Sequence, residues 1–396
     1  MEMDPRVLAA QAMHRAKQAE LEMARAAYLP VVKGTGLVGA LESQDPLSRD
    51  GTKKTLGLEV EQAIPVFQHE STRLALARAA AAVEEAEVQR MRQSVLAEML
   101  EIVLNVQAAR ETLVLRTLLL INLREQFAAV REAVACGGER LTQEKLVRSR
   151  LSQTEALWER AASDLGNSLW SLRQRLALTG TDKHPNIVVD EAEMYRWWYA
   201  PLSLEMLENI AAQTAPALLK AQAEVESARA EQAIARSDRL PSLSVSLQGQ
   251  RGTFGTSSAD SQSAFLGLNI PLYDGGAGSS RVDSATQRLQ AARERAHQEA
   301  RQTSQRLADA WNRWKSAATL AQAWRASEQD EAATVQLSEE QLVGGAHTEM
   351  GVLRVRQSWL ETRLQGVDYR TQKQIAWVRL MQETGVLPTL APSAEK

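Results

Sequence analysis

Cysteine is almost absent from this sequence, and the shortage excludes several kinds of site. Cys136 is the only cysteine, so the chain cannot form an intrachain disulfide, and the five histidines are scattered without metal-ligand spacing. We therefore expect no metal site and no cofactor. The formal net charge is only -3, and basic residues are mixed among acidic ones, so nothing indicates a nucleic-acid partner.

Catalytic motifs and membrane-spanning helices are also missing. We find no nucleophile elbow, no phosphate-binding loop and no carboxylate pair at catalytic spacing, so we predict that the protein is not an enzyme. The most apolar run, 113–123, is interrupted by Arg116 and is too short to span a bilayer. We expect this run to be a buried seam of a long helix.

The sequence instead contains two copies of one unit. Landmarks recur in the same order with an offset of a little over two hundred residues, which is the signature of an internal repeat. The landmark pairs are Pro5 with Pro216, Pro30 with Pro241, Pro65 with Pro271, and Gly138 with Gly345. We divide the chain into repeats 1–200 and 201–396, with a linker over 178–200. Trp197 and Trp198 in the linker are expected to pack against helices, an interaction patch being the alternative.

Helical patterns occupy most of each repeat. Stretches rich in Ala, Glu, Arg and Gln favour helices, and Gly pairs favour helix reversals. The predicted helices cover 6–28, 71–134, 141–177, 216–238, 279–342 and 348–384. A tract of roughly 65 residues would make a helix of about 100 Å, which is typical of a coiled-coil arm. Each repeat is therefore predicted to contain one antiparallel coiled-coil hairpin.

Four segments change to a period of two, which predicts strands with one apolar and one polar face. These strands are expected over 31–42, 55–66, 242–252 and 264–273, with polar loops over 43–54 and 252–263. The apolar face would suit a membrane, but an open sheet leaves edge amides unsatisfied in lipid, so the edges would need other copies of the chain. The alternative is a non-membrane coiled-coil scaffold with a small β-cap.

The ordered and duplicated motifs resemble the TolC-like outer-membrane factors, also called outer membrane efflux proteins. The Leu-Pro after each first helix, the segment Ile270-Pro-Leu-Tyr-Asp-Gly-Gly276 and the Gly-then-Leu spacing at each tip carry the resemblance, which spans about 5–387. It implies a fold that is mostly α with a small β part. It also implies a homotrimer in which four strands per chain form a 12-strand barrel continued by a 12-helix periplasmic tunnel.

The resemblance also implies a function and partners. The chain would be a passive duct of a tripartite efflux or secretion system, in contact with outer-membrane lipid, a periplasmic adaptor (membrane-fusion) protein and an inner-membrane pump such as an RND transporter. The pump would supply the energy and set the choice of substrate. Family members are exported, whereas residues 1–5 show no signal-peptide pattern. We therefore expect a trimmed sequence, a start assigned too far downstream, or a copy that is not exported.

By the same resemblance, the two tips would form the periplasmic mouth and meet the adaptor. The expected tip residues are Cys136, Gly137, Gly138, Glu139, Val343, Gly344, Gly345 and Ala346. The family often has an acidic residue six positions after the tip glycine, and Glu144 fits this place while its repeat partner is Gly351. Arg354 stands close by, so we name Glu144 and Arg354 as constriction candidates. They could form a latch between helices, and an exposed coiled-coil role for Arg354 is the alternative.

Overall fold

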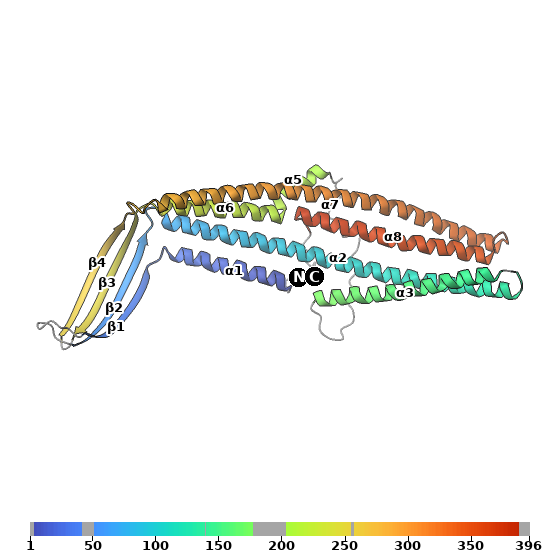
Figure 1. The fold of residues 1–396 in the computed structure, drawn as a ribbon, viewed down its shortest axis with the longest axis horizontal. Helices are drawn as coiled ribbons and strands as arrows, with labels where there is room; N and C mark the ends of the chain where they lie inside the picture. The colour runs from blue at the N-terminus through green and yellow to red at the C-terminus, as the bar shows by residue number, and fades with distance from the viewer. Residues whose placement is uncertain (1–3, 42–50, 139, 177–202, 255–256, 388–396) are drawn as a thin grey trace, which may run out of the picture. The chain divides into compact units, whose positions relative to one another are not determined.

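The fold was obtained as a computed structural model, which describes residues 4–41, 51–138, 140–176, 203–254 and 257–387. It consists of long helices and one four-stranded sheet (Figure 1). In chain order the elements are α1 Pro5–Ala26, β1 Val31–Leu41, β2 Gly51–Ile64, α2 His69–Ala135, α3 Leu141–Arg175, α5 Leu204–Thr214, α6 Pro216–Ser237, β3 Ser242–Phe254, β4 Ser257–Asn269, α7 Ala277–Val343 and α8 Glu349–Thr384.

The six predicted helices are confirmed, with boundaries that differ from the sequence pattern by at most two residues. The short helix α5 was not predicted; its first turn is capped by Ser203, whose hydroxyl accepts a hydrogen bond from the Met206 amide. The predicted roles of Trp197 and Trp198 lie outside the described residues. Within the described ranges, no helix combines the length and apolarity that crossing a bilayer requires, and no three potential ligands are grouped to hold a metal ion.

The four strands form one antiparallel sheet in the order β1-β2-β3-β4. The predicted polar loops are partly wrong, because 51–54 belong to β2, and 252–254 and 257–263 belong to β3 and β4. Ser and Gly residues indicate a loop by composition, but their backbone groups can join a ladder as well as those of any residue. At the other end, β4 stops at Asn269, so Ile270 and the residues up to 273 follow the strand instead of belonging to it.

The described residues fall into two compact units, each of which takes segments from both sequence repeats. The sheet unit contains residues 5–91 and 216–301, and the helical unit contains residues 1–4, 92–215 and 302–396. The sheet unit thus holds all four strands together with α1, α6 and the first parts of α2 and α7. The helical unit holds the rest of α2 and α7 with α3, α5 and α8.

The core of the helical unit lies along α2 and α8. Leu115, Leu119 and Leu123 recur every four residues and are buried against a second group on α8. This confirms that the apolar run 113–123 contains a buried seam, although Val114, Leu118 and Ile121 of the same run are exposed. The cluster on α8 consists of Leu360, Leu364 and Val367.

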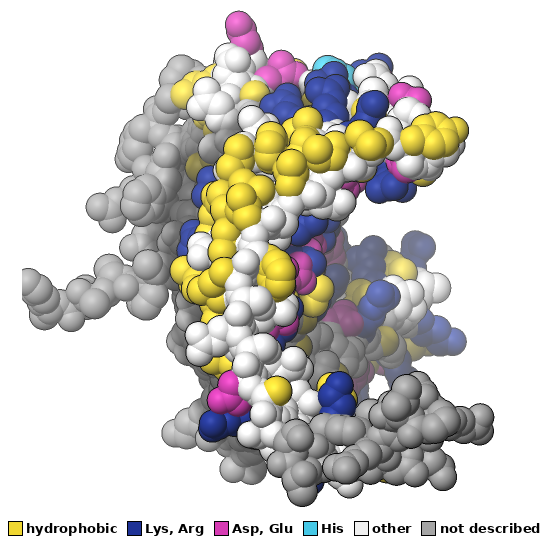
Figure 2. Space-filling model, turned by 90° about the vertical axis from the view of Figure 1, so that its left-hand side faces the viewer, with side chains coloured by type: hydrophobic (Ala, Val, Ile, Leu, Met, Phe, Trp, Pro, Cys, Tyr) yellow, Lys and Arg dark blue, Asp and Glu magenta, His cyan; other side chains and the backbone are white. Residues whose placement is uncertain are grey.

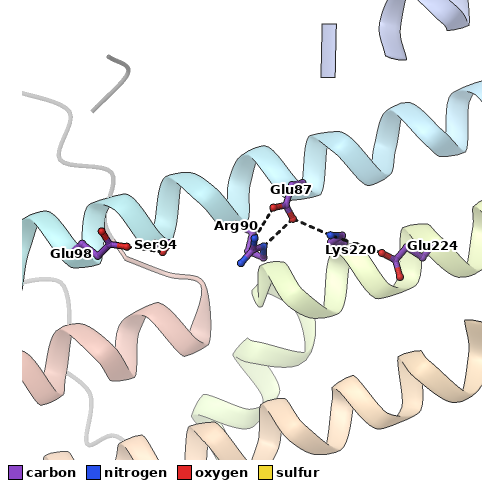
Figure 3. A network of polar contacts seen from close by, with 6 residues as sticks. All are labelled: Glu87, Arg90, Ser94, Glu98, Lys220 and Glu224. Atoms are coloured by element: carbon purple, nitrogen blue, oxygen red, sulfur yellow. Dashed lines mark hydrogen bonds and ion pairs between the residues drawn. The ribbon is translucent and has the colours of Figure 1, made fainter. Parts of the chain in front are cut away.

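Two helices of the sheet unit are joined by a small charged network (Figure 3). The Glu87 carboxylate on α2 accepts hydrogen bonds from Arg90, at 2.6 and 2.9 Å, and pairs with Lys220 of α6 at 3.2 Å. The hydrogen bond from Arg90 is the main reason that the pKa of Glu87 lies below its ordinary value, with Lys220 acting in the same direction and partial burial against it. The network therefore connects the first repeat to the second.

The turn from β4 into α7 is built around a carboxylate. Asp274 accepts hydrogen bonds from the backbone amides of Gly276 and Gly278, at 3.1 and 2.5 Å, and so satisfies donors that the start of α7 would leave free. Gly275 and Gly276 have φ angles of 70° and 88°, a region that glycine adopts without a steric cost.

The corresponding turn from β2 into α2 uses different residues. Gln68 takes the left-handed conformation with a φ of 68°, and no glycine is present at this turn. His69 then donates from Nε2 towards the carbonyl oxygens of Leu240 and Pro241, at 3.3 and 3.2 Å. The first repeat is thus joined to the chain segment between α6 and β3, whereas Asp274 makes its contacts within its own turn.

Candidate functional site: a two-faced sheet and two helical tips

One face of the sheet is apolar over most of its area. Residues that are directly opposite each other in an antiparallel ladder lie on the same face, so the register assigns each side chain to a face. One row is formed by Val32, Val60, Leu247 and Ala264, and the rows beside it add aliphatic side chains from β2, β3 and β4. The aliphatic members of this face are Val32, Val38, Leu56, Leu58, Val60, Ile64, Leu243, Val245, Leu247, Leu266 and Leu268.

Most of these apolar side chains are exposed in the single chain, and Val60, Ile64, Leu243 and Val245 are partly buried. Leu56 and Leu266 are 70% and 69% exposed, and Val38 is 75% exposed. Figure 2 shows hydrophobic side chains gathered in a band on the side of the molecule that carries the sheet. An apolar patch of this extent is unusual on a soluble monomer and marks a surface that contacts another molecule or a membrane.

The opposite face of the sheet is polar. It is dominated by Ser, Thr, Gln and Glu side chains, and it carries an ion pair between Lys33 and Glu61 at 3.0 Å. Beside this pair, Gln248 donates a hydrogen bond to Glu59 at 2.9 Å. Val31, Leu37 and Phe265 are large apolar side chains on this face. The sheet therefore separates an apolar surface from a surface that water can solvate.

Both edges of the sheet are open in the single chain. β1 pairs only with β2, and β4 pairs only with β3. The outward amide and carbonyl groups of β1 and β4 therefore have no strand partner among the described residues. Such edges readily pair with a strand of another chain.

The two helical tips close with the same backbone geometry. At the first tip, Gly137 has a φ of 76°, and the Gly138 amide donates to the Ala133 carbonyl at 2.8 Å. At the second tip, Gly345 has a φ of 76°, and the Ala346 amide donates to the Gln341 carbonyl at 2.9 Å. These bonds satisfy carbonyls at the helix ends and define a left-handed cap at each reversal.

By this geometry, the residues that are equivalent in the two tips differ by one position from those that the sequence pattern pairs. The sequence pattern pairs Gly138 with Gly345, whereas the left-handed residues are Gly137 and Gly345. The leucines that follow also differ, because Leu146 is 48% exposed and Leu353 is 6% exposed. The shared Gly-then-Leu spacing therefore does not mark equivalent positions in the two turns.

The expected tip residues lie at the ends of α2 and α7. Cys136, Gly137 and Gly138 follow α2, and Val343 is the last residue of α7, followed by Gly344, Gly345 and Ala346. Val343 is 91% exposed, so an aliphatic side chain stands in solvent at the second tip. Glu139 lies outside the described residues.

The two constriction candidates lie on different helices of the helical unit. Glu144 is half-buried in the first turn of α3, and Arg354 is exposed on α8. No hydrogen bond or ion pair joins Glu144 to Arg354, so a latch between them remains a prediction. The sequence pattern missed His347, whose ring lies over Gly351: a Cβ at residue 351 would be 2.6 Å from the His347 Cε1 atom.

The chain matches known proteins over most of its length. Residues 1–178 and 207–386 match the family model described as outer membrane efflux protein. The protease secretion protein PrtF of Dickeya chrysanthemi is 24% identical over 279 residues, which are 67% of this chain and 58% of PrtF. The chain thus spans a little over half the length of this curated relative.

Solved structures share the fold. The MtrE outer membrane channel of Neisseria gonorrhoeae matches with a TM-score of 0.79 at 15% identity, covering 97% of this chain and 86% of MtrE. The outer membrane protein VceC of Vibrio cholerae matches with a TM-score of 0.76 at 16% identity, covering 97% of this chain and 93% of VceC. At these identities the likeness concerns the fold alone.

Proposed function

Because the chain belongs to the outer membrane efflux protein family, we propose that it is a subunit of a passive outer-membrane duct in an efflux or secretion system. The observation that carries this proposal is the two-faced open sheet. Its exposed aliphatic face suits lipid, and its face of Ser, Gln and paired charges suits a wet lumen. The description of the family supports efflux, and the name of PrtF, a protease secretion protein, supports secretion.

The open edges support assembly of several copies. In lipid, the unpaired groups of β1 and β4 would each cost several kcal/mol, so the sheet must be closed by neighbouring chains. Four antiparallel strands leave β4 antiparallel to the β1 of the next copy, so copies can join in a ring without reversing direction. Three copies, as in the family, would contribute twelve strands.

The height of the apolar band fits this role. Along β2 the band runs from Leu56 to Ile64, which is eight residue steps or about 27 Å at 3.4 Å per step. Strand tilt shortens this height to roughly 20 Å, which is close to the band of about 25 Å on outer-membrane sheets. The four strands have 11 to 14 residues, enough to cross a bilayer at such a tilt.

A matched pair of labels on β2 tests the two faces. Leu58 and Glu59 are neighbours in sequence but lie on the apolar and polar face, respectively. In a background with Cys136→Ser, we expect the E59C variant in vesicles to react with a water-soluble maleimide and the L58C variant to resist it. A nitroxide-bearing lipid should quench a fluorophore attached to the L58C variant more strongly than one attached to the E59C variant. Equal reactivity and equal quenching at both sites would contradict the two-faced arrangement.

The seam between copies can be tested by a disulfide. The seam between β2 and β3 joins the two repeats within the chain and contains the pair Val60 and Leu247. Adding the proline offset of 206 residues to Val60 gives Leu266 of β4, and subtracting the offset of 211 residues from Leu247 gives Gly36 of β1. By analogy with the seam inside the chain, Leu266 of one copy should therefore be opposite Gly36 of its neighbour. We expect oxidation of the G36C/L266C variant to give cross-linked trimers. If the register between copies is shifted by two residues, a cysteine at Gly34 or Val38, which lie on the same face of β1, should cross-link instead. The G36C/Q248C variant is the control, because Gln248 lies on the other face of an interior strand.

The tips are proposed to dock the periplasmic adaptor, and through it the inner-membrane pump. Exposed Val343 and the glycines at both reversals support a compact contact surface, and Glu144 and Arg354 are proposed to line the constriction. In a co-purification with the adaptor, V343D should reduce adaptor recovery while the trimer mass stays unchanged. Unchanged recovery would remove the second tip from the docking surface.

The oligomeric mass is the first measurement. Light scattering corrected for bound detergent should give a trimer that precipitates when detergent is withdrawn, because the apolar face would then be exposed to water. A monodisperse monomer or dimer without detergent would contradict the duct and favour a coiled-coil scaffold.

A further inference from the structure

The apolar face of the sheet ends in two cations on the side of the hairpin turns. Arg251 of β3 is directly opposite Leu56, the last aliphatic residue of β2 on this face. Lys54 of β2 is one same-face step further towards the turn and is directly opposite Thr253. Figure 2 shows charged side chains beyond the hydrophobic band, on the side of the hairpin turns.

The register places the two cations close together. Lys54 and Arg251 are diagonal neighbours on adjacent strands, a relation that sets side chains about 7–8 Å apart. Asp260 of β4 is directly opposite Arg251 and accepts a hydrogen bond from its Nε atom at 3.0 Å. This bond orients the guanidinium group and leaves its terminal N–H donors available.

The other charged positions of the sheet show that this arrangement is local. Towards the helices, the apolar face continues with Gln62, Ile64 and Leu243, and its described strand residues include no further cation. On the polar face, Lys33 is paired with Glu61, and Lys53 lies next to Lys54 in sequence but points to the lumen side. Among the described strand residues, two cations and one carboxylate therefore give the turn end of the apolar face a net positive charge.

We propose that Lys54 and Arg251 bind the phosphate groups of lipids in the membrane leaflet that surrounds the hairpin turns. The proposal rests on the proposed function, because it requires the apolar face to be in a bilayer. Side chains just beyond an apolar band stand at the level of the lipid head groups, where long basic side chains extend to meet anions. An Arg can hold two phosphate oxygens at once, and a neighbouring Lys adds a point charge.

The test uses the full chain in detergent and a bisphosphorylated glycolipid, lipid A. Native mass spectrometry of the intact oligomer at increasing lipid A concentration gives an apparent Kd. We expect Lys54→Gln and Arg251→Gln each to weaken binding about fivefold, the effect of one cation near a charged lipid surface. Lys53→Gln is the matched control and should leave the Kd unchanged, because its side chain is on the other face.

Two further arms identify the ligand chemistry. Dephosphorylated lipid A should bind with the weakened Kd of the K54Q/R251Q variant, and inorganic phosphate at equal concentration should not displace lipid A. Asp260→Asn should tighten binding, because it removes the nearby negative charge, and a folding defect would not produce such a gain. Equal Kd values for the wild type and K54Q/R251Q, equal binding of both lipids, or displacement by inorganic phosphate would overturn the proposal.

The same spectra separate this proposal from the proposed function. A trimer whose lipid affinity is unchanged in K54Q/R251Q would overturn the lipid site and leave the duct in place. A monomer in every sample would remove the duct itself, and the lipid site with it.

Discussion

The two repeats build the same elements with different chemistry, and the contrast is clearest where a strand turns into a long helix. The second repeat uses Asp274 and two left-handed glycines, all within one short segment. The first repeat uses left-handed Gln68 and the contact of His69 with carbonyls between α6 and β3. One turn is thus stabilised by contacts within its own segment, whereas the other contacts a distant part of the chain.

At the tips, the two repeats agree in backbone geometry and differ in side chains. Gly137 and Gly345 have the same φ of 76°. Thr348 caps α8 by accepting a hydrogen bond from the Gly351 amide at 3.2 Å, whereas Arg140 at the start of α3 makes no side-chain cap. The backbone therefore sets the reversal, and the side chains decide how firmly the next helix begins.

The largest expected effect is at the strand-to-helix turns. Asp274→Ala should cost about 1–2 kcal/mol, because two amides at the start of α7 lose their acceptor. Hydrogen exchange should then be faster at Gly276 and Gly278. His69→Ala is the comparison, and exchange in the first turn of α2 should change little because His69 donates to residues outside that turn. Equal fraying of α2 and α7 would contradict the contrast between the two turns.

The next effect concerns the tip glycines. Gly137→Ala and Gly345→Ala should each cost about 1 kcal/mol, because a Cβ is strained in the left-handed region. Gly138→Ala should be nearly neutral, since its added Cβ would lie at an ordinary contact distance of 3.5 Å from the Ala133 carbonyl oxygen. Thermal unfolding in detergent measures all three variants. A similar loss in Gly138→Ala would show that the equivalence inferred from the sequence was the better one.

A smaller effect is expected from the helix caps. Thr348→Ala should destabilise the start of α8 by about 1 kcal/mol and expose the Gly351 amide to exchange. Arg140→Thr should stabilise the start of α3 by about 0.5 kcal/mol, because it introduces the acceptor that the first repeat lacks. Opposite shifts in amide exchange at the two helix starts are the expected result, and shifts of the same sign would argue against the cap difference.

The smallest expected effect concerns the charged network that joins the two repeats, and it depends on pH. Glu87→Gln should lower stability by less than about 1 kcal/mol at neutral pH. The pKa of Glu87 is lowered in the folded protein, so its contribution is present above the ordinary value of 4.5 and is lost as the pH falls through the folded pKa. Melting temperatures of wild type and Glu87→Gln should therefore converge in acid. Glu226→Gln, which removes an exposed pair within α6, should show no difference at either pH.

Much of the fold was predictable, because a long periodic pattern of apolar residues is compatible with only one type of secondary structure. Helix boundaries followed from prolines and glycines, and the strand pairs from their alternation. The segment 257–263 was assigned to a loop because composition was given more weight than alternation, although Ser261 and Ser263 continue the polar face of β4. Extending the period of two through this segment would also have placed Asp260 on the apolar face.

The candidate site was less predictable, because it depends on pairing and on turn geometry. Which strands are neighbours decides that Lys54 and Arg251 meet, and no spacing along the chain reveals this. Likewise, Gly137 and Gly138 are adjacent glycines, and only the φ angle distinguishes the residue that reverses the chain. Glu144 was chosen by its spacing from Gly138, and Arg354 because it stands close to Gly351, the repeat partner of Glu144. The spacing argument for Glu144 takes Gly138 as the tip glycine, whereas Gly137 is the left-handed residue.

The single cysteine has a practical consequence for spectroscopy. Cys136 is exposed directly after the end of α2, beside the left-handed Gly137. One spin label per chain can therefore be attached at the tip without removing any other thiol. In the proposed trimer, three equivalent probes would report on the width of the mouth by their mutual distances. If the duct opens when the adaptor is added to such a sample, the measured distribution of distances between the labels should shift to longer values.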